Sequence, residues 1–296
     1  MDTMVERFRA LHRPGQPLLM ANAWDVGSAL LLASLGFEAL ATTSSGHAAT
    51  LGRLDGDLAR DEALAHAAGL VAATELPVSA DLENGYADDP EGVAETVRRA
   101  VACGLAGCSI EDATGRSDDP IYDAALATER VAAAAEAAGG RLVLTARAEN
   151  HLYAREDLDD TIARLRSFAQ AGADVVYAPG LSRLEDVRAV VEAVDRPVNV
   201  LAYPGLPRSC ASPASAAAMP GRAGAPTSCA SWACVAHGRS RSPGGPRSAS
   251  ASTRPPAPRP CRRAGCQPGG RCGSSFADAA ATGRHGPGPS EFGCRG

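Results

Sequence analysis

The sequence predicts an α/β protein built as a (β/α)8 TIM barrel in which strand 8 and the closing helices are missing. Short apolar runs alternate with helical patterns from about Leu18 to Pro204. Polar residues follow these runs at the same end. Strand-then-helix units with short connections are typical of a parallel sheet, and eight of them close a barrel. The unit occurs seven times, so we assign residues 1–207 to an incomplete barrel domain.

The predicted strands are short apolar runs bounded by Gly, Pro or polar residues. They are residues 18–24, 39–45, 77–83, 107–112, 142–149, 174–178 and 197–202. The helical patterns are residues 26–35, 61–74, 90–103, 124–138, 157–171 and 184–194, after a short amphipathic helix at the N-terminus. Asp89 before Pro90 predicts a helix start. Gly36, Gly104 and Gly172 each predict a helix end before the next strand.

The segment Asp81-Leu82-Glu83-Asn84-Gly85-Tyr86 carries the most chemical information. Side chains alternate along a strand, so Asp81 and Glu83 are predicted to point the same way. Two carboxylates on one face repel each other unless a cation lies between them, and Gly85 allows a sharp turn. The segment predicts a divalent-cation site. A solvated strand end, where acidic residues are common, is the alternative.

Polar residues also end the other predicted strands. They are Asn22 and Asp25, the segment Ser44-Ser45-Gly46-His47, Glu111 and Asp112, Arg147, Glu149 and Asn150, Tyr177 and Asn199. Capping for solubility explains one or two of these positions. Charges inside apolar runs, such as Glu111 and Arg147, must be paired or bind a ligand. The carboxyl ends of the strands are therefore predicted to form a ligand site.

The composition predicts two different kinds of polypeptide. There is no lysine, and all 29 basic residues are arginine. Residues 1–207 carry 17 arginines and 32 acidic residues, net −15, whereas residues 208–296 carry 12 and 2, net +10. No segment resembles a signal peptide or reaches the roughly 20 apolar residues of a membrane span, so a cytoplasmic location is expected. Cys103 and Cys108 are predicted to be packed thiols.

Six segments in order resemble the isocitrate lyase/phosphoenolpyruvate mutase superfamily, including its 2-methylisocitrate lyase-like and carboxyvinyl-carboxyphosphonate phosphorylmutase-like members. They are Thr43-Ser44-Ser45-Gly46, Leu51-Gly52-Arg53-Leu54-Asp55-Gly56, Asp81-Leu82-Glu83-Asn84-Gly85-Tyr86, Ser109-Ile110-Glu111-Asp112, Thr145-Ala146-Arg147 and Asp174-Val175-Val176-Tyr177-Ala178-Pro179-Gly180. The resemblance runs from about Phe8 to Pro207. It implies a phosphoenolpyruvate mutase-type barrel that serves as a catalytic domain.

The resemblance implies a Mg²⁺-dependent enzyme, with Mn²⁺ as a possible substitute. The substrate would be a small 2-oxo or 2-hydroxy carboxylic acid, and a C–C or P–C bond would form or break through an enolate. The implied metal ligands are Asp81 directly, and Asp55, Glu83 and Glu111 directly or through water. The implied substrate-binding residues are Ser44, Ser45, Gly46, Arg147 and Asn199. The implied catalytic residues are Arg147, Asp55 and His47, although a structural role for His47 is equally open.

One departure bears on the reaction. Isocitrate and methylisocitrate lyases carry a Lys-x-Cys-Gly-His segment after strand four, whose Cys is the catalytic acid. Residues 113–120 of this chain contain no Cys, Lys or His. The loop is also shorter than the gate of the phosphoenolpyruvate mutases. The resemblance therefore implies metal and enolate chemistry with an open substrate, a small oxo-dicarboxylate such as oxaloacetate included.

Residues 208–296 form a low-complexity tail rich in Arg, Pro, Ser and Cys, with seven of the nine cysteines. Three interpretations stay open: a disordered basic segment that could bind nucleic acid, a metal module, and a reading-frame shift. The frame shift is preferred, because the family pattern stops one strand early. A gap between the seventh and first strands is then expected. Its unpaired backbone groups could pair with other chains, so poor solubility is expected as well. A catalytically inactive truncated barrel is the alternative to an enzyme. The family's homo-oligomers exchange a last helix for which this chain has no candidate.

Overall fold

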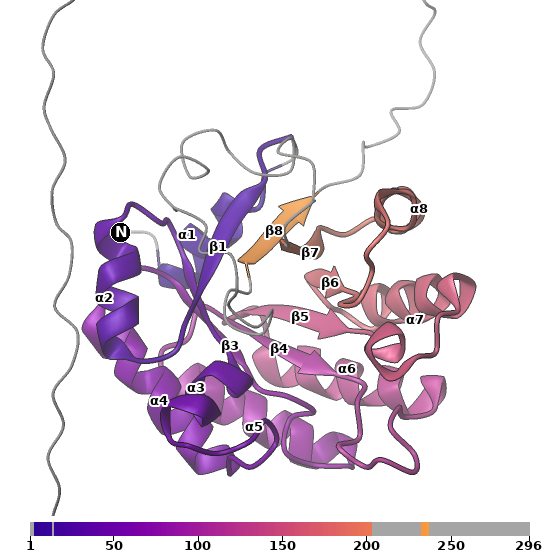
Figure 1. Ribbon diagram of the computed structural model, residues 1–296, viewed down its shortest axis with the longest axis horizontal. Helices are drawn as coiled ribbons and strands as arrows, with labels where there is room; N and C mark the ends of the chain where they lie inside the picture. Colours follow the sequence, from indigo (N-terminus) through magenta and orange to yellow (C-terminus); the bar gives the residue numbers. More distant parts are fainter. Residues whose placement is uncertain (1–2, 14, 203–231, 237–296) are drawn as a thin grey trace, which may run out of the picture. The chain divides into compact units, whose positions relative to one another are not determined.

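Seven parallel strands follow one another around a curved sheet in chain order (Figure 1). They are β1 (Leu18–Ala23), β2 (Leu40–Thr42), β3 (Val78–Asp81), β4 (Gly107–Glu111), β5 (Val143–Arg147), β6 (Val175–Tyr177) and β7 (Val198–Ala202). The computed structural model describes residues 3–13, 15–202 and 232–236. Every one of these strands falls inside a predicted run, so the predicted α/β barrel class is confirmed.

The eighth position of the sheet is filled by β8 (Trp232–Ala236), which runs antiparallel to both of its neighbours. It pairs with β1 on one side and with β7 on the other, and the ring closes. The predicted unpaired gap between β7 and β1 is therefore wrong. Unpaired N–H and C=O groups at a sheet edge can bind any extended segment within reach. No eighth parallel strand occurs in the described residues, and the rest of the predicted tail lies outside them.

The helices lie around the outside of the curved sheet (Figure 1). They are α1 (Met4–Leu11), α2 (Val26–Ser34), α3 (Ser44–Thr50), α4 (Arg60–Ala73), α5 (Pro90–Ala102), α6 (Ala124–Ala138), α7 (Leu158–Gln170), α8 (Leu184–Ala193) and the 3-10 turn η1 (Asn150–Tyr153). The predicted helix start at Asp89 is confirmed, since its carboxylate accepts from the Gly92 amide at 2.9 Å. The predicted ends at Gly36, Gly104 and Gly172 are confirmed by left-handed backbone there.

The short helix α3 was not predicted. The predicted second strand extends to Ser45, with Gly46 and His47 after it, but β2 stops at Thr42 and a helix begins at Ser44. The Thr43 side chain caps the new helix by accepting from the Gly46 amide at 3.4 Å. Ser and Thr side chains compete with the sheet ladder in this way, so the stretch leaves the sheet early. The strand-to-helix step sets Ser44 and Ser45 at the carboxyl end of the barrel.

The core is built from Ala, Val and Leu, with few large aromatic side chains. Cys108 is fully buried in β4, and burial raises the pKa of its thiol to about 12. Cys103 is half-buried and free, so the prediction of packed thiols is confirmed for both residues. Among the described helices, none combines the length and apolar character that crossing a bilayer requires.

We predict that Gly46→Ala destabilises the fold. A Cβ on Gly46 would lie 2.6 Å from Cδ1 of Trp24 and 2.6 Å from the Thr43 methyl. Overpacking of this kind costs about 1–3 kcal/mol of unfolding free energy. The control is Gly69→Ala inside α4, where a Cβ would meet only Val26 Cγ2 at 4.0 Å. Alanine favours a helix over glycine, so this variant should gain up to about 1 kcal/mol. Urea melts of both variants measure the difference, and equal midpoints would contradict the packing argument.

Candidate active site

A cavity of about 620 Å³ opens at the carboxyl ends of the parallel strands. Most of the residues singled out from the sequence line it. They are Ser44, Ser45, Asp55, Asp81, Glu83, Glu111, Arg147 and Asn199. Segments far apart in the chain thus meet at one place, because the carboxyl ends of parallel strands share one edge of a barrel.

Asp81 and Glu83 both face the cavity, although the predicted reason is wrong. Strand β3 ends at Asp81, so strand alternation does not orient Glu83. Glu83 instead has a left-handed backbone, with φ +48°, in the turn that follows. This conformation is uncommon for a residue other than Gly or Asn. The predicted turn at Gly85 is confirmed, with φ +77° and an amide that donates to the Leu82 carbonyl at 2.8 Å.

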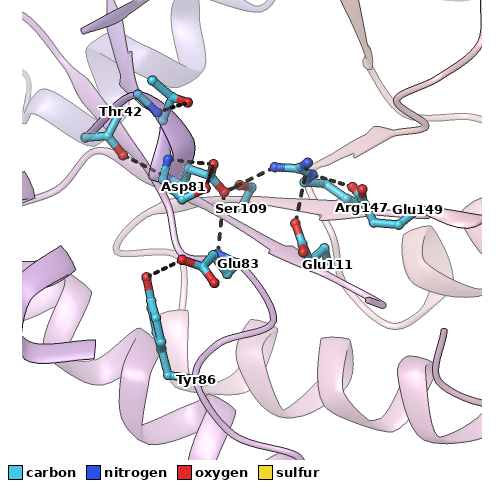
Figure 2. Close-up of polar contacts among 11 residues, drawn as sticks. Thr42, Asp81, Glu83, Tyr86, Ser109, Glu111, Arg147 and Glu149 are labelled. Carbon is cyan, nitrogen blue, oxygen red and sulfur yellow. Dashed lines mark hydrogen bonds and ion pairs between the residues drawn. The ribbon is translucent and has the colours of Figure 1, made fainter. Parts of the chain in front are cut away.

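The Asp81 carboxylate is held from helix α3 and from strands β4 and β5 (Figure 2). Its Oδ2 accepts from the amide and hydroxyl of Ser44, at 3.1 and 3.0 Å. Its Oδ1 lies 3.4 Å from the Ser109 hydroxyl and 3.1 Å from Nη1 of Arg147. Its own amide donates to the Thr42 hydroxyl at 2.9 Å. The carboxylate is therefore fixed in one orientation before any ligand binds.

Arg147 ends β5 and extends all of its nitrogens toward carboxylates (Figure 2). Nη1 meets Asp81 at 3.1 Å, Nη2 meets Glu111 at 3.4 Å, and Nε donates to Glu149 at 2.7 Å. The guanidinium also lies over the Tyr177 ring, 5.2 Å from its centroid. Burial alone would lower the pKa of Arg147, but these carboxylates raise it well above its ordinary value. Arg147 is therefore a fixed cation.

Negative charge exceeds positive charge in this cavity. Five carboxylates line it, and Arg147 is the one cation among the described lining residues. Burial, followed by the charges of Asp81 and Asp55, raises the pKa of Glu83 to about 7. Burial also raises the pKa of Asp55, and it raises that of Glu111 well above the ordinary value despite Arg147.

Carboxylates of this kind suit Mg²⁺, which binds through one or two carboxylates and keeps several waters. Within the described residues, no group of three His, Cys, Asp or Glu side chains is arranged to hold a metal ion directly. The carboxylates would therefore suit a hard cation bound by Asp81, with its waters on Glu83, Asp55 and Glu111, rather than a cation bound by three carboxylates. The excess negative charge fits a divalent cation as well.

Gly46 and His47 do not line the cavity. The Gly46 amide is used in the Thr43 cap, and the residue packs beneath Trp24. The His47 ring stacks on His66, with centroids 3.5 Å apart and planes 8° from parallel. Burial, with the neighbouring His47, lowers the pKa of His66 to about 4. This geometry matches the structural alternative for His47.

Glu149 and Tyr177, which the sequence analysis included among the polar strand ends without a specific role, also line the cavity. Glu149 is almost fully buried, with 3% of its side chain exposed, and it orients Arg147. Its amide donates to Asp112, whose other oxygen pairs with Arg164 of α7 at 3.1 Å. The sequence does contain an indication of this role, since Glu149 is a charge in an apolar run two residues after Arg147.

Arg130 also went unnoticed, because nothing in the helical pattern around it marks a buried charge. It lies in α6 with 1% exposure. Its guanidinium donates to the carbonyls of Asn84, Ala87 and Asp88, in the turn that follows Glu83. It also stacks on the Tyr122 ring at 4.0 Å. Arg130 therefore braces the turn that carries Glu83.

The sequence model of phosphoenolpyruvate phosphomutase matches residues 8–218. The chain belongs to this family. An uncharacterised protein of Mycobacterium tuberculosis (strain H37Rv) is 34% identical over 200 residues, 67% of this chain and 75% of that protein. The 2-methylisocitrate lyase of Escherichia coli (strain K12) is 28% identical over 200 residues, 64% and 67% of the two chains. The predicted membership of the isocitrate lyase/phosphoenolpyruvate mutase superfamily is confirmed.

Solved structures of the superfamily agree. A Burkholderia cenocepacia J2315 protein, described as a lyase/mutase, shares 55% identity, with TM-score 0.63 over 66% of this chain and 71% of that one. A 2,3-dimethylmalate lyase, described as a phosphoenolpyruvate mutase/isocitrate lyase superfamily member, shares 29% identity, with TM-score 0.61 over 67% and 72%. Those of these relatives that have a described activity are thus lyases or mutases.

We predict a pH-dependent stability that Glu83→Gln removes. The pKa of Glu83 is higher in the folded protein than its ordinary 4.5, so the folded state binds a proton more tightly than the unfolded state. Its stabilisation is full below about pH 4.5 and is lost as pH rises through about 7.

Chemical denaturation of the metal-free protein from pH 4 to 8 measures this effect. Wild type should lose stability relative to Glu83→Gln across the window, by less than roughly 1.4 kcal/mol per pH unit. The control is Glu95→Gln, at an exposed position of α5. The stability of this variant should change with pH in parallel with wild type. A Glu83→Gln curve parallel to wild type would disprove the raised pKa.

We predict that Arg130→Met lowers the unfolding free energy by about 3 kcal/mol, because three carbonyl groups lose their donor. Arg98→Met is the matched control on α5, since its pairs with Glu91 and Glu95 are exposed and screened by solvent, so its loss of stability should be much smaller. Thermal or urea unfolding compares the two variants. Equal losses would show that Arg130 does not brace the turn.

Proposed function

We propose that this protein is a Mg²⁺-dependent lyase or mutase acting on a small 2-oxo or 2-hydroxy carboxylic acid. The reaction would form or break a C–C or P–C bond next to the carbonyl, through an enolate. The supporting observation is the contact between Arg147 and Asp81 in a carboxylate-rich cavity, within a chain of this lyase and mutase family. A fixed guanidinium beside a cation site suits negative charge that develops on oxygen.

Asp81 would hold the cation directly, and Glu83, Asp55 and Glu111 would hold its waters. Mn²⁺ would satisfy the same oxygen donors. A bound divalent cation supplies electrophilic charge that polarises a carbonyl oxygen. Both oxygens of Asp81 already accept hydrogen bonds, so metal binding would cost little further loss of side-chain freedom. Burial raises the pKa of Asp55, and we propose this residue as an additional catalytic group.

Arg147 would donate to the enolate oxygen, and Glu149 would keep it aimed there. Ser45 at the start of α3 would bind the substrate carboxylate. Ser44, whose hydroxyl donates to Asp81, would join it by exchanging that contact for the substrate. Asn199 of β7 lines the same cavity, and within the described residues its buried Oδ1 has no hydrogen-bond partner. This oxygen would accept a hydrogen bond from the substrate. Gly46 and His47 would contribute by holding α3 in place.

We predict that the protein binds oxalate in the presence of Mg²⁺ only. Oxalate is a planar dianion that resembles the enolate of a 2-oxo acid, so it probes the site without turnover. Isothermal titration calorimetry should detect binding by wild type and by Asp159→Asn, whose side chain is exposed on α7. Asp81→Asn should weaken binding at least about a hundredfold. Asp81→Ala should abolish metal-dependent turnover of any 2-oxo acid, and retained activity would refute the assignment.

A further inference from the structure

Apolar side chains stand at the mouth of a cavity whose floor is charged. Leu152 and Tyr153 belong to η1, the turn that follows β5, and both line the cavity. Leu152 is 53% exposed and Tyr153 is 41% exposed. Pro179, from the loop after β6, lines the same side. Exposed apolar groups that gather at a ligand cavity mark a surface that contacts ligand.

The turn that carries Leu152 is firmly held. Asn150 is fully buried, and its Nδ2 donates to the Thr161 hydroxyl at 2.7 Å. Ala154 ends the turn with a left-handed backbone, φ +57°. The backbone of Gly180 packs so closely that a Cβ there would lie 3.0 Å from His151 Cβ and 3.2 Å from Leu152 Cδ2. The position of Leu152 is therefore fixed by the fold.

Tyr153 lines the same cavity as the carboxylates Glu111, Glu149 and Asp55. After burial, the charges of Glu111, Glu149 and Asp55 all raise the pKa of its hydroxyl. These carboxylates belong to three different segments, so the tyrosine lies within electrostatic reach of each. A substrate whose reacting end lies at Arg147 would extend along Tyr153 and Leu152 toward solvent.

Among the described residues, this cavity has no cation left for a second substrate carboxylate. Arg147 is the one cation among the described lining residues; Asp81, Glu111 and Glu149 already share its charge, and its remaining donors are assigned to the reacting end of the substrate. Neighbouring arginines are engaged outside the cavity, Arg53 with Glu62 and Arg116 with Asp88. A second carboxylate would lose water and meet like charge, which is unfavourable without a partner.

We propose that the substrate is a 2-oxo or 2-hydroxy monocarboxylic acid whose far end is an uncharged alkyl or aryl group packed on Leu152 and Tyr153. The inference rests on the proposed function and narrows its substrate class. It removes oxo-dicarboxylates such as oxaloacetate, which the sequence left open. Leu152 is a specificity-determining residue in this account.

Two ligands of matched shape test the proposal. The compound 5-methyl-2-oxohexanoate has the same chain as 2-oxoglutarate, with a branched isopropyl group in place of the distal carboxylate. Isothermal titration in Mg²⁺ buffer, with turnover followed in parallel, should show the alkyl compound binding at least about tenfold more tightly. Pyruvate, which both ligands contain as a head group, is titrated alongside with and without Mg²⁺.

Matched leucine variants locate the preference. Leu152→Arg should reverse it, by about tenfold or more, because the new guanidinium can pair with the distal carboxylate. Leu30→Arg on α2, where the leucine is 51% exposed outside the cavity, should leave the preference unchanged. Both leucines are exposed, so neither substitution should threaten folding.

The possible failures are distinguishable. If no 2-oxo acid binds in a Mg²⁺-dependent manner, the proposed function fails and this inference fails with it. If pyruvate binds with Mg²⁺ but 2-oxoglutarate binds as tightly as the alkyl compound, this inference alone is overturned. An unchanged preference in Leu152→Arg would also overturn it.

Discussion

The candidate site depends on one guanidinium that reaches across three strands. Arg147 of β5 lies opposite Glu111 of β4 in the ladder, and Asp81 of β3 lies opposite Ser109 of β4. This register brings the side chains of Asp81 and Glu111 toward one cation. Removing Arg147 would leave these carboxylates buried together without compensation, which is strongly unfavourable. The charge balance of the site therefore depends on the parallel register of β3, β4 and β5.

Buried arginines extend this arrangement outward to the helices. Glu149, which orients Arg147, is linked through its amide to Asp112 and from there to Arg164 of α7. Arg130 of α6 binds the carbonyls behind Glu83. A planar guanidinium with several donors can hold a turn that a lysine ammonium cannot fix as well. The outer helices thus help to set the geometry of the strand ends.

The fold class and the grouping of the strand ends were predictable, because parallel strands bring their carboxyl ends to one edge whatever the details. The orientation of Glu83 was not, since a left-handed residue after Asp81 replaces the alternation of a strand. Helix α3 was missed because Thr43 caps it locally, against the apolar pattern. Arg130 and Arg164 could not be found from sequence, since a buried arginine on a helix has the same spacing as an exposed one. The antiparallel pairing of β8 lay beyond any rule for βα units.

Strands and loops contribute different kinds of residue to the cavity. Strand ends supply the charges, Asp81, Glu111 and Arg147, and their positions follow from the sheet register. The turn η1 and the loop after β6 supply the apolar mouth through Leu152 and Pro179. Loops can change without altering the sheet, so chemistry and substrate choice can vary separately on one barrel. The loop after β4, residues 113–120, folds back through a bridge between Ala113 and Ile121, and its one arginine pairs with Asp88 and Asp119. This loop therefore adds no cation to the cavity. The mouth stays apolar, and the charges of the floor come from other segments.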